Sequence, residues 1–145
     1  GFFPVVEHLE DLPRSTFDHT SLMITDYTLD FMTERQLTQL NETLPLLLQP
    51  HGLFVATITD TSLPLFRQYQ GLTEYGVQLH YRTPEKLKRL LDDLKLILVA
   101  NTGNRNHLLI FSRKDSGTPE FTGNPIGLYR NEGTFGDWLL KRRGP

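Results

Sequence analysis

Short apolar runs alternate with amphipathic segments along the chain. Residues 19–25 centre on Leu22-Met23-Ile24 and predict a strand. Residues 53–59 are almost continuously apolar and rich in β-branched side chains, which predicts a strand buried on both faces. Two further apolar runs, 96–100 and 107–112, flank a turn-forming polar segment and predict an antiparallel hairpin.

The first predicted helix begins at Thr33. Thr33 and Gln36 have the spacing of a capping box, in which each side chain satisfies a free backbone amide at the helix start. Leucines then recur at helical spacing and form one apolar face: Leu37, Leu40, Leu44, Leu47 and Leu48. We expect Pro45 to kink the last turn or end it early, and residues 49–52 to stop the helix.

A second helix is predicted to start at Pro84. Thr83 is a good N-cap, proline is favoured at the first helical position, and Glu85 suits the positive end of the helix dipole. Its buried stripe is predicted to comprise Leu87, Leu90, Leu91 and Leu94. Weaker patterns suggest a short strand at residues 3–9 and a short helix at 62–70.

This order of elements predicts an α/β fold. We expect a mostly parallel sheet with a C-terminal antiparallel hairpin and helices on both faces. Residues 1–113 would form this domain, and residues 114–145 a glycine- and proline-rich extension that docks across the domain or on a partner.

Composition excludes several classes of function. The chain has 145 residues and a net charge of −2, which argues against a general nucleic-acid surface or binding to an anionic membrane. Its apolar runs are too short to span a bilayer. It has no cysteine, which rules out disulfides and thiolate metal sites and is compatible with the cytoplasm, where we place it. None of the five histidines has metal-ligand spacing with another, so no metal site is expected.

Four local motifs occur in a recognisable order. They are Glu10-Asp11-Leu12-Pro13 followed by Phe17-Asp18, the junction from Leu46 to Ala56, the segment from Tyr81 to Leu91, and the closing strand from His107 to Lys114. Together they resemble the C-terminal half of the class I S-adenosylmethionine-dependent methyltransferases. The resemblance implies a half Rossmann-like domain with the strand order four, five, seven, six.

The resemblance also implies what this chain does not contain. That family holds its cofactor on a glycine-rich turn after the first strand and on an acid that ends the second strand. Neither feature occurs in this sequence. We therefore expect the chain alone not to bind S-adenosylmethionine, and the cofactor-binding half to lie upstream or on another chain. The alternative is a catalytically inactive methyltransferase-like domain that serves as a structural or interaction module.

The resemblance assigns candidate site residues. Asp26 and Tyr27 follow the fourth strand and would face the reacting methyl group, with Asp26 as a general base or an orienting group and Tyr27 bounding the pocket. The cofactor would contact Asp11, Leu12 and Thr25, and the substrate Asp60, Thr61 and Tyr81. The alternative is purely structural: Asp26 caps a turn, Tyr27 packs, Asp11 and Leu12 shape a turn, and Asp60 with Thr61 caps a helix.

Strand 19–25 would form an open sheet edge if the first half is missing. An apolar edge with free amides needs a cover. Residues 3–9, a second copy of the chain, or another polypeptide that carries the missing half would each provide one.

Overall fold

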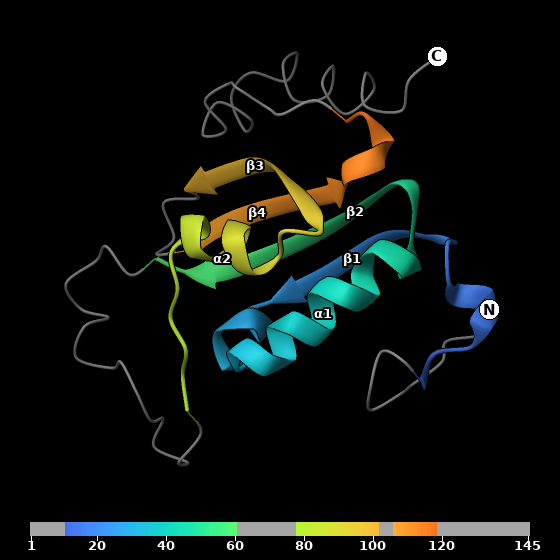
Figure 1. Ribbon diagram of the computed structural model, residues 1–145. Helices are drawn as coiled ribbons and strands as arrows, with labels where there is room; N and C mark the ends of the chain where they lie inside the picture. The colour runs from blue at the N-terminus through green and yellow to red at the C-terminus, as the bar shows by residue number, and fades with distance from the viewer. Residues whose placement is uncertain (1–10, 61–77, 102–105, 119–145) are drawn as a thin grey trace.

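A computed structural model describes residues 11–60, 78–101 and 106–118. The elements are β1 (Thr20–Asp26), α1 (Glu34–Leu47), β2 (Leu48–Thr59), α2 (Pro84–Leu90), β3 (Leu94–Asn101) and β4 (Asn106–Arg113), with a 3-10 turn η3 (Thr28–Phe31) after β1. Figure 1 shows their arrangement. The strand predicted at 3–9, the helix predicted at 62–70 and almost all of the extension lie outside the described residues.

The strands lie side by side in the order β1-β2-β4-β3. This is the order that the resemblance implied, and the antiparallel hairpin of β3 and β4 is confirmed. The expectation of a mostly parallel sheet is wrong, because β1–β2 is parallel but β2–β4 and β4–β3 are antiparallel. The reason is the position of β4. It inserts between two strands that run the same way and so makes both of its own pairings antiparallel.

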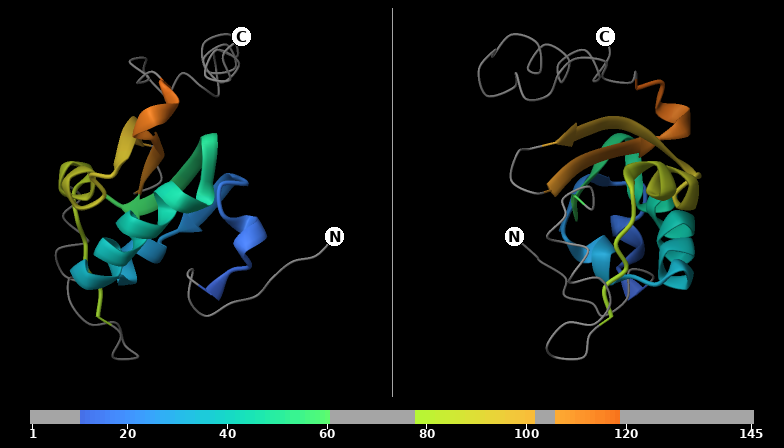
Figure 2. Two further views of the ribbon diagram at one scale, coloured as in Figure 1. Left: turned by 45° about the vertical axis from the view of Figure 1, so that its right-hand side comes forward. Right: turned by 90° about the vertical axis from the view of Figure 1, so that its left-hand side faces the viewer.

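Both described helices lie on one face of the sheet, as the two views in Figure 2 show, so the prediction of helices on both faces is wrong for this part of the chain. The connections β1–α1–β2 and β2–α2–β3 cross the sheet in the same direction. Two crossover connections of the same hand that lead in the same direction across a sheet place their helices on the same face of it.

The main core lies between this helix pair and the sheet. Leucines of α1 and α2 pack there against alternate residues of β2 and β4, including Phe54, Ala56, Ile58, Leu109 and Phe111. The rings of Phe54 and Phe111 stack with centroids 5.8 Å apart. A smaller cluster lies on the opposite face and comprises Leu53, Ile97, Leu98, Ala100 and Ile110.

The helix α1 starts as predicted and ends differently. The capping box of Thr33 and Gln36 is present in both directions. The helix continues past Pro45 to Leu47, because Leu44 and Leu47 on either side of the proline are fully buried and anchor the last turn. No separate stop segment follows, since β2 already begins at Leu48.

Gly52 is required where β1 and β2 meet. A Cβ at this position would lie 2.6 Å from the backbone oxygen of Thr20. Glycine therefore allows the closest approach of the two strands at their amino ends.

The helix α2 is shorter than its leucine stripe suggested. Thr83 caps it through the amide of Lys86, and Pro84 occupies the first turn. Leu91 already forms the C-cap and Leu94 belongs to β3, so both contribute to the core from outside the helix.

Candidate functional site

Polar side chains gather where β1 and β2 end. Asp26 is paired in register with Thr57, and the Thr57 hydroxyl donates a hydrogen bond to the exposed Asp26 carboxylate. The amide of Tyr27 donates to both the backbone oxygen of Thr57, at 3.0 Å, and its side-chain oxygen, at 3.2 Å. The carboxyl ends of the two parallel strands are therefore joined by a small polar network.

Tyr27 has an unusual backbone conformation. Its φ of 58° lies in the left-handed region, which bulky residues rarely occupy. Its phenolic oxygen accepts a hydrogen bond of 2.8 Å from the side-chain nitrogen Nδ2 of Asn106, at the start of β4. Tyr27 is thus held by hydrogen bonds at its backbone amide and at its phenolic oxygen. Backbone strain of this kind is often found at functional sites.

Asp60 lies directly after β2 and is almost fully buried. One carboxylate oxygen accepts a hydrogen bond from the side-chain amide of Asn101, at 3.1 Å, and the other is 3.3 Å from Nε2 of His107. Nδ1 of His107 is buried, and no group in the described part of the chain forms a hydrogen bond with it. Asp60 directly follows β2, Asn101 ends β3 and His107 lies in β4, and together they form a polar group beside the first network.

Asp30, in η3, is a second buried acid at this end of the sheet. Its carboxylate accepts hydrogen bonds from the amide and the hydroxyl of Thr59, at 3.1 and 2.7 Å. Burial raises the pKa of Asp30, although the Thr59 hydrogen bonds and the positive charge of Arg82 act in the opposite direction. Asp30 thereby links η3 to the end of β2.

The segment before α2 is held against η3. The guanidinium of Arg82 donates to the backbone oxygens of Leu29, at 3.1 Å, and Met32, at 2.7 Å, and burial lowers its pKa. The amide of His80 donates to the backbone oxygen of Asp30. Tyr81 lies between these anchors, and burial together with the negative charge of Asp30 raises its pKa.

The predicted site residues separate into two groups. Five of them, Thr25, Asp26, Tyr27, Asp60 and Tyr81, lie at or next to the carboxyl ends of β1 and β2. Asp11 and Leu12 do not join them. Leu12 lines a cavity with residues near the amino ends of the strands, among them Leu46 in the last turn of α1. Thr61 lies outside the described residues, and the chemical role of every one of these residues stays a prediction.

Sequence reasoning missed Asp30, Asn101, Asn106 and His107 as parts of this polar region. The sequence pattern did not single out Asp30, and His107 was considered only as a metal ligand. One signal was available, because a hairpin that places 107–112 beside 53–59 also brings His107 to the end of that strand. The observed register pairs His107 with Ile58, two residues before Asp60.

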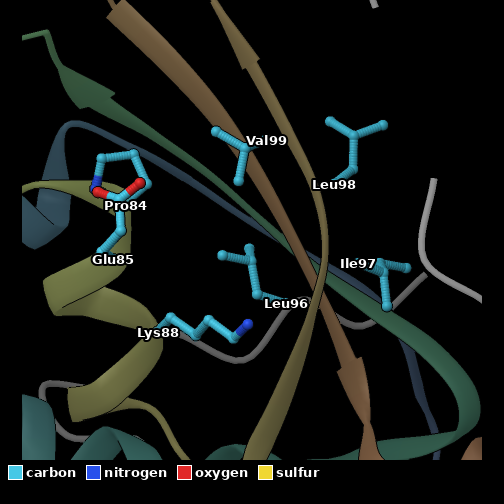
Figure 3. A pocket seen from close by; sticks show the side chains of 7 residues that line it. All are labelled: Pro84, Glu85, Lys88, Leu96, Ile97, Leu98 and Val99. Carbon is cyan, nitrogen blue, oxygen red and sulfur yellow. The ribbon is translucent and has the colours of Figure 1, made fainter. Parts of the chain in front are cut away.

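Two surface cavities lie apart from this polar region. One, of about 300 Å³, runs between α2 and β3 and is shown in Figure 3. The other, of about 440 Å³, is the cavity that Leu12 lines with Arg14, Phe17 and Leu46. Neither of these two cavities is lined by Asp26, Tyr27 or Asp60.

Two features are absent from the described part of the chain. Among residues 11–60, 78–101 and 106–118, no group of three or more His, Cys, Asp or Glu side chains could hold a metal ion. Within the same ranges, no helix combines the length and apolarity needed to cross a membrane.

No family model matches the chain, and no curated protein matches its sequence. Solved structures do match its fold. The PH0226 protein from Pyrococcus horikoshii OT3 superposes with a TM-score of 0.59 at 14% identity, over 76% of this chain and 58% of that one. An S-adenosylmethionine-dependent methyltransferase from Methanosarcina mazei gives 0.57 at 12% identity, over 75% of this chain and 66% of that one.

Human N-acetylserotonin methyltransferase, solved with S-adenosylmethionine, gives a TM-score of 0.53 at 18% identity over 64% of this chain. The chain spans only 29% of that enzyme's length, and less than two thirds of the PH0226 protein. At these identities the likeness concerns the fold alone. The chain therefore has an α/β fold similar to part of the S-adenosylmethionine-dependent methyltransferase fold.

Proposed function

We propose that this chain is the C-terminal portion of an S-adenosylmethionine-dependent methyltransferase, and that the cofactor-binding half is supplied upstream or by another chain. One observation carries the proposal. The sheet order β1-β2-β4-β3 places the polar ends of β1 and β2 next to the outer edge of the described sheet. Ligands of α/β sheets bind at the carboxyl ends of strands, where the strand order reverses.

Residues at this edge fit one side of a cofactor site. The hydroxyl of Thr25, near the end of β1, is buried and has no hydrogen-bond partner among the described residues. Such a group is costly to leave unsatisfied and would be satisfied by a polar atom of a ligand or of a completing segment. Asp11 and Leu12 lie near the amino end of β1. They would contact the cofactor only if the completing half bound part of the cofactor at that end of the strand.

The remainder of the cofactor site has to come from elsewhere. A glycine-rich turn that could receive the cofactor on its backbone amides does not occur in the sequence. The active site is thus proposed to be shared: this chain supplies the residues that face the substrate, and the other half supplies most of the contacts with S-adenosylmethionine.

The bound cofactor would supply an activated methyl group. This chain's part is then mainly to position the acceptor, because proximity and orientation provide a large share of the rate of such transfers. In the proposal, the exposed Asp26 carboxylate accepts a proton or a hydrogen bond from a hydroxyl or amine acceptor. Tyr27, fixed by Asn106, bounds the pocket, and Asp60, Thr61 and Tyr81 contact the acceptor.

Calorimetry with S-adenosylmethionine tests the proposal. The chain alone should show no binding at millimolar ligand. The same chain expressed with the polypeptide encoded before Gly1, or mixed with a separate completing half, should bind with a micromolar dissociation constant. Asp26→Asn in the completed protein should then lower methyl transfer more than cofactor affinity.

The alternative function, an inactive structural or interaction domain, is favoured by the absence of the glycine-rich turn from the sequence. It predicts that the completed protein also fails to bind S-adenosylmethionine. The same titration therefore distinguishes the two functions.

A further inference from the structure

The outer edge of β1 combines a backbone that has no partner among the described strands with exposed apolar side chains. Among the described strands, β1 pairs only with β2. Its Leu22 is 53% exposed and its Ile24 67% exposed, whereas Met23 between them packs against the main core. Leu22 and Ile24 therefore form a small apolar patch on the face opposite the helices, at a strand edge.

The sequence of β1 is self-complementary in one antiparallel register. If two copies pair about a two-fold axis at Met23, Leu22 of each lies opposite Ile24 of the other. Asp26 then lies opposite Thr20, and the two acids are at opposite ends of the contact. Each exposed apolar residue meets an apolar partner, and no like charges face each other.

Neighbouring registers lack this match. An axis at Leu22 would place Ile24 opposite Thr20 of the other copy, so the exposed apolar side chain of Ile24 would have no apolar partner across the contact. An axis at Ile24 would place Leu22 opposite Asp26, which sets an apolar side chain against a carboxylate. Charge and apolarity thus select the register centred on Met23.

We propose that the open edge of β1 binds a second copy of this chain, antiparallel and centred on Met23, so that the two sheets become continuous. The contact is isologous, as a two-fold dimer requires. It consists of one strand pair, so the interface is small and the dimer weak, with a dissociation constant on the order of 10 to 100 μM. The proposal does not rest on the methyltransferase function: it concerns the chain without a completing half, whose strand would take the same edge and exclude the second copy.

Sedimentation of the whole chain tests the association. Over a range from about 1 μM to 1 mM, which brackets the expected dissociation constant, the average mass should rise from that of a monomer toward that of a dimer. The double variant Leu22→Lys, Ile24→Lys should remain monomeric throughout, with an unchanged circular dichroism spectrum. Val99→Lys is the matched control, because Val99 is an apolar residue of β3 that is 43% exposed. This variant should dimerise like the parent.

Cysteine cross-linking tests the register, since the chain has no cysteine of its own. Leu22→Cys mixed with Ile24→Cys should form a disulfide-linked heterodimer under mild oxidation, because directly opposite residues are within reach. Either variant alone places its cysteines diagonally, about 7–8 Å apart, and should cross-link at least tenfold more slowly.

Three results would overturn the proposal. They are a monomer at every concentration, a lysine double variant that dimerises like the parent, and equal cross-linking in the mixture and in the single variants. None of them bears on S-adenosylmethionine binding by the completed protein, so this proposal and the proposed function can fail independently.

Discussion

The neighbouring strands β1 and β2 are similar in apolar character but differ in burial. In β2, Leu53, Phe54, Ala56 and Ile58 are all buried: the last three lie on the helix-covered face and Leu53 lies on the opposite face. In β1, the helix-covered face is packed through Met23, but the opposite face leaves Leu22 and Ile24 exposed. An interior strand has partners on both edges and cover on both faces, and β1 has neither in full.

The comparison shows where the described sheet ends. The apolar residues of β1 are typical of a strand whose outer edge is covered by another segment, since proteins rarely leave such an edge open. Substitutions in the interior strand, at the junction between the two strands and in the open strand should therefore differ in their effects.

The largest effect is expected in the interior. Phe54→Ala removes a fully buried ring that stacks on Phe111 and should lower the free energy of unfolding by about 3–5 kcal/mol. Urea denaturation of the chain at low micromolar concentration measures this. A loss below about 1 kcal/mol would mean that β2 is not the centre of the core.

A smaller loss is expected at the junction of the strands. Gly52→Ala places a Cβ against the backbone oxygen of Thr20 and should cost about 1–3 kcal/mol, because backbone cannot move aside as a flexible side chain can. Gly117→Ala is the control for conformation alone. Gly117 has a φ of 68° but no atom within 4 Å of the added Cβ, so it should cost about 1–2 kcal/mol. Equal stability of Gly52→Ala and the parent would argue against the close approach.

Asp30 should make stability depend on pH. Burial raises its pKa in the folded protein above the ordinary value of 3.8, so the folded state holds this proton more tightly than the unfolded chain. Raising the pH from 3.8 through the raised pKa should therefore reduce the contribution of Asp30 to stability, and above that pKa the loss is complete.

The matched variant is Asp30→Asn, which cannot ionise. Denaturation of both proteins over this pH range should show the parent losing stability relative to the variant as the pH rises. A difference that stays constant, or that changes in the opposite sense, would contradict the assignment of burial as the dominant cause.

Removing the Tyr27 hydroxyl should have a modest effect. Tyr27→Phe deletes the hydrogen bond from Asn106 and leaves the ring in place, so it should cost about 0.5–1.5 kcal/mol. Asn106→Ala should cost a similar amount, and the double variant should cost less than the sum of the two. Full additivity would show that the two side chains do not interact.

The smallest effect is expected on the open strand. Ile24→Thr keeps a β-branched side chain at an exposed position and should change stability by less than about 0.5 kcal/mol in dilute solution. Urea denaturation of this variant and of Phe54→Ala under the same conditions compares the loss of unfolding free energy in β1 with that in β2. A loss of 2 kcal/mol or more would show that this face is covered in the monomer.

Local pattern predicted the elements that depend on local chemistry. The capping box at Thr33, the N-cap at Thr83 and the hairpin of β3 and β4 are all present. Each depends on residues close together in sequence. Pro45 was misleading because its local preference is outweighed by the burial of Leu44 and Leu47, which is a tertiary effect.

The site was predictable only in part, because much of it is assembled across strands. Asp26 and Tyr27 could be chosen from their position after a strand. The pairing of Asp60 with His107 depends on β4 lying next to β2, and the link from Tyr27 to Asn106 joins residues 79 positions apart. No local window contains such information, so these partners emerged only from the sheet register.

Amide hydrogen exchange of β1 tests most directly whether this strand is where the rest of a methyltransferase fold joins. In the chain alone, at concentrations low enough to keep it monomeric, amides of Thr20–Asp26 should exchange much faster than those of Leu53–Thr59. In the completed protein, the two strands should be protected to a similar degree. Strong protection of β1 in the isolated monomer, or no gain in protection upon completion, would contradict the account.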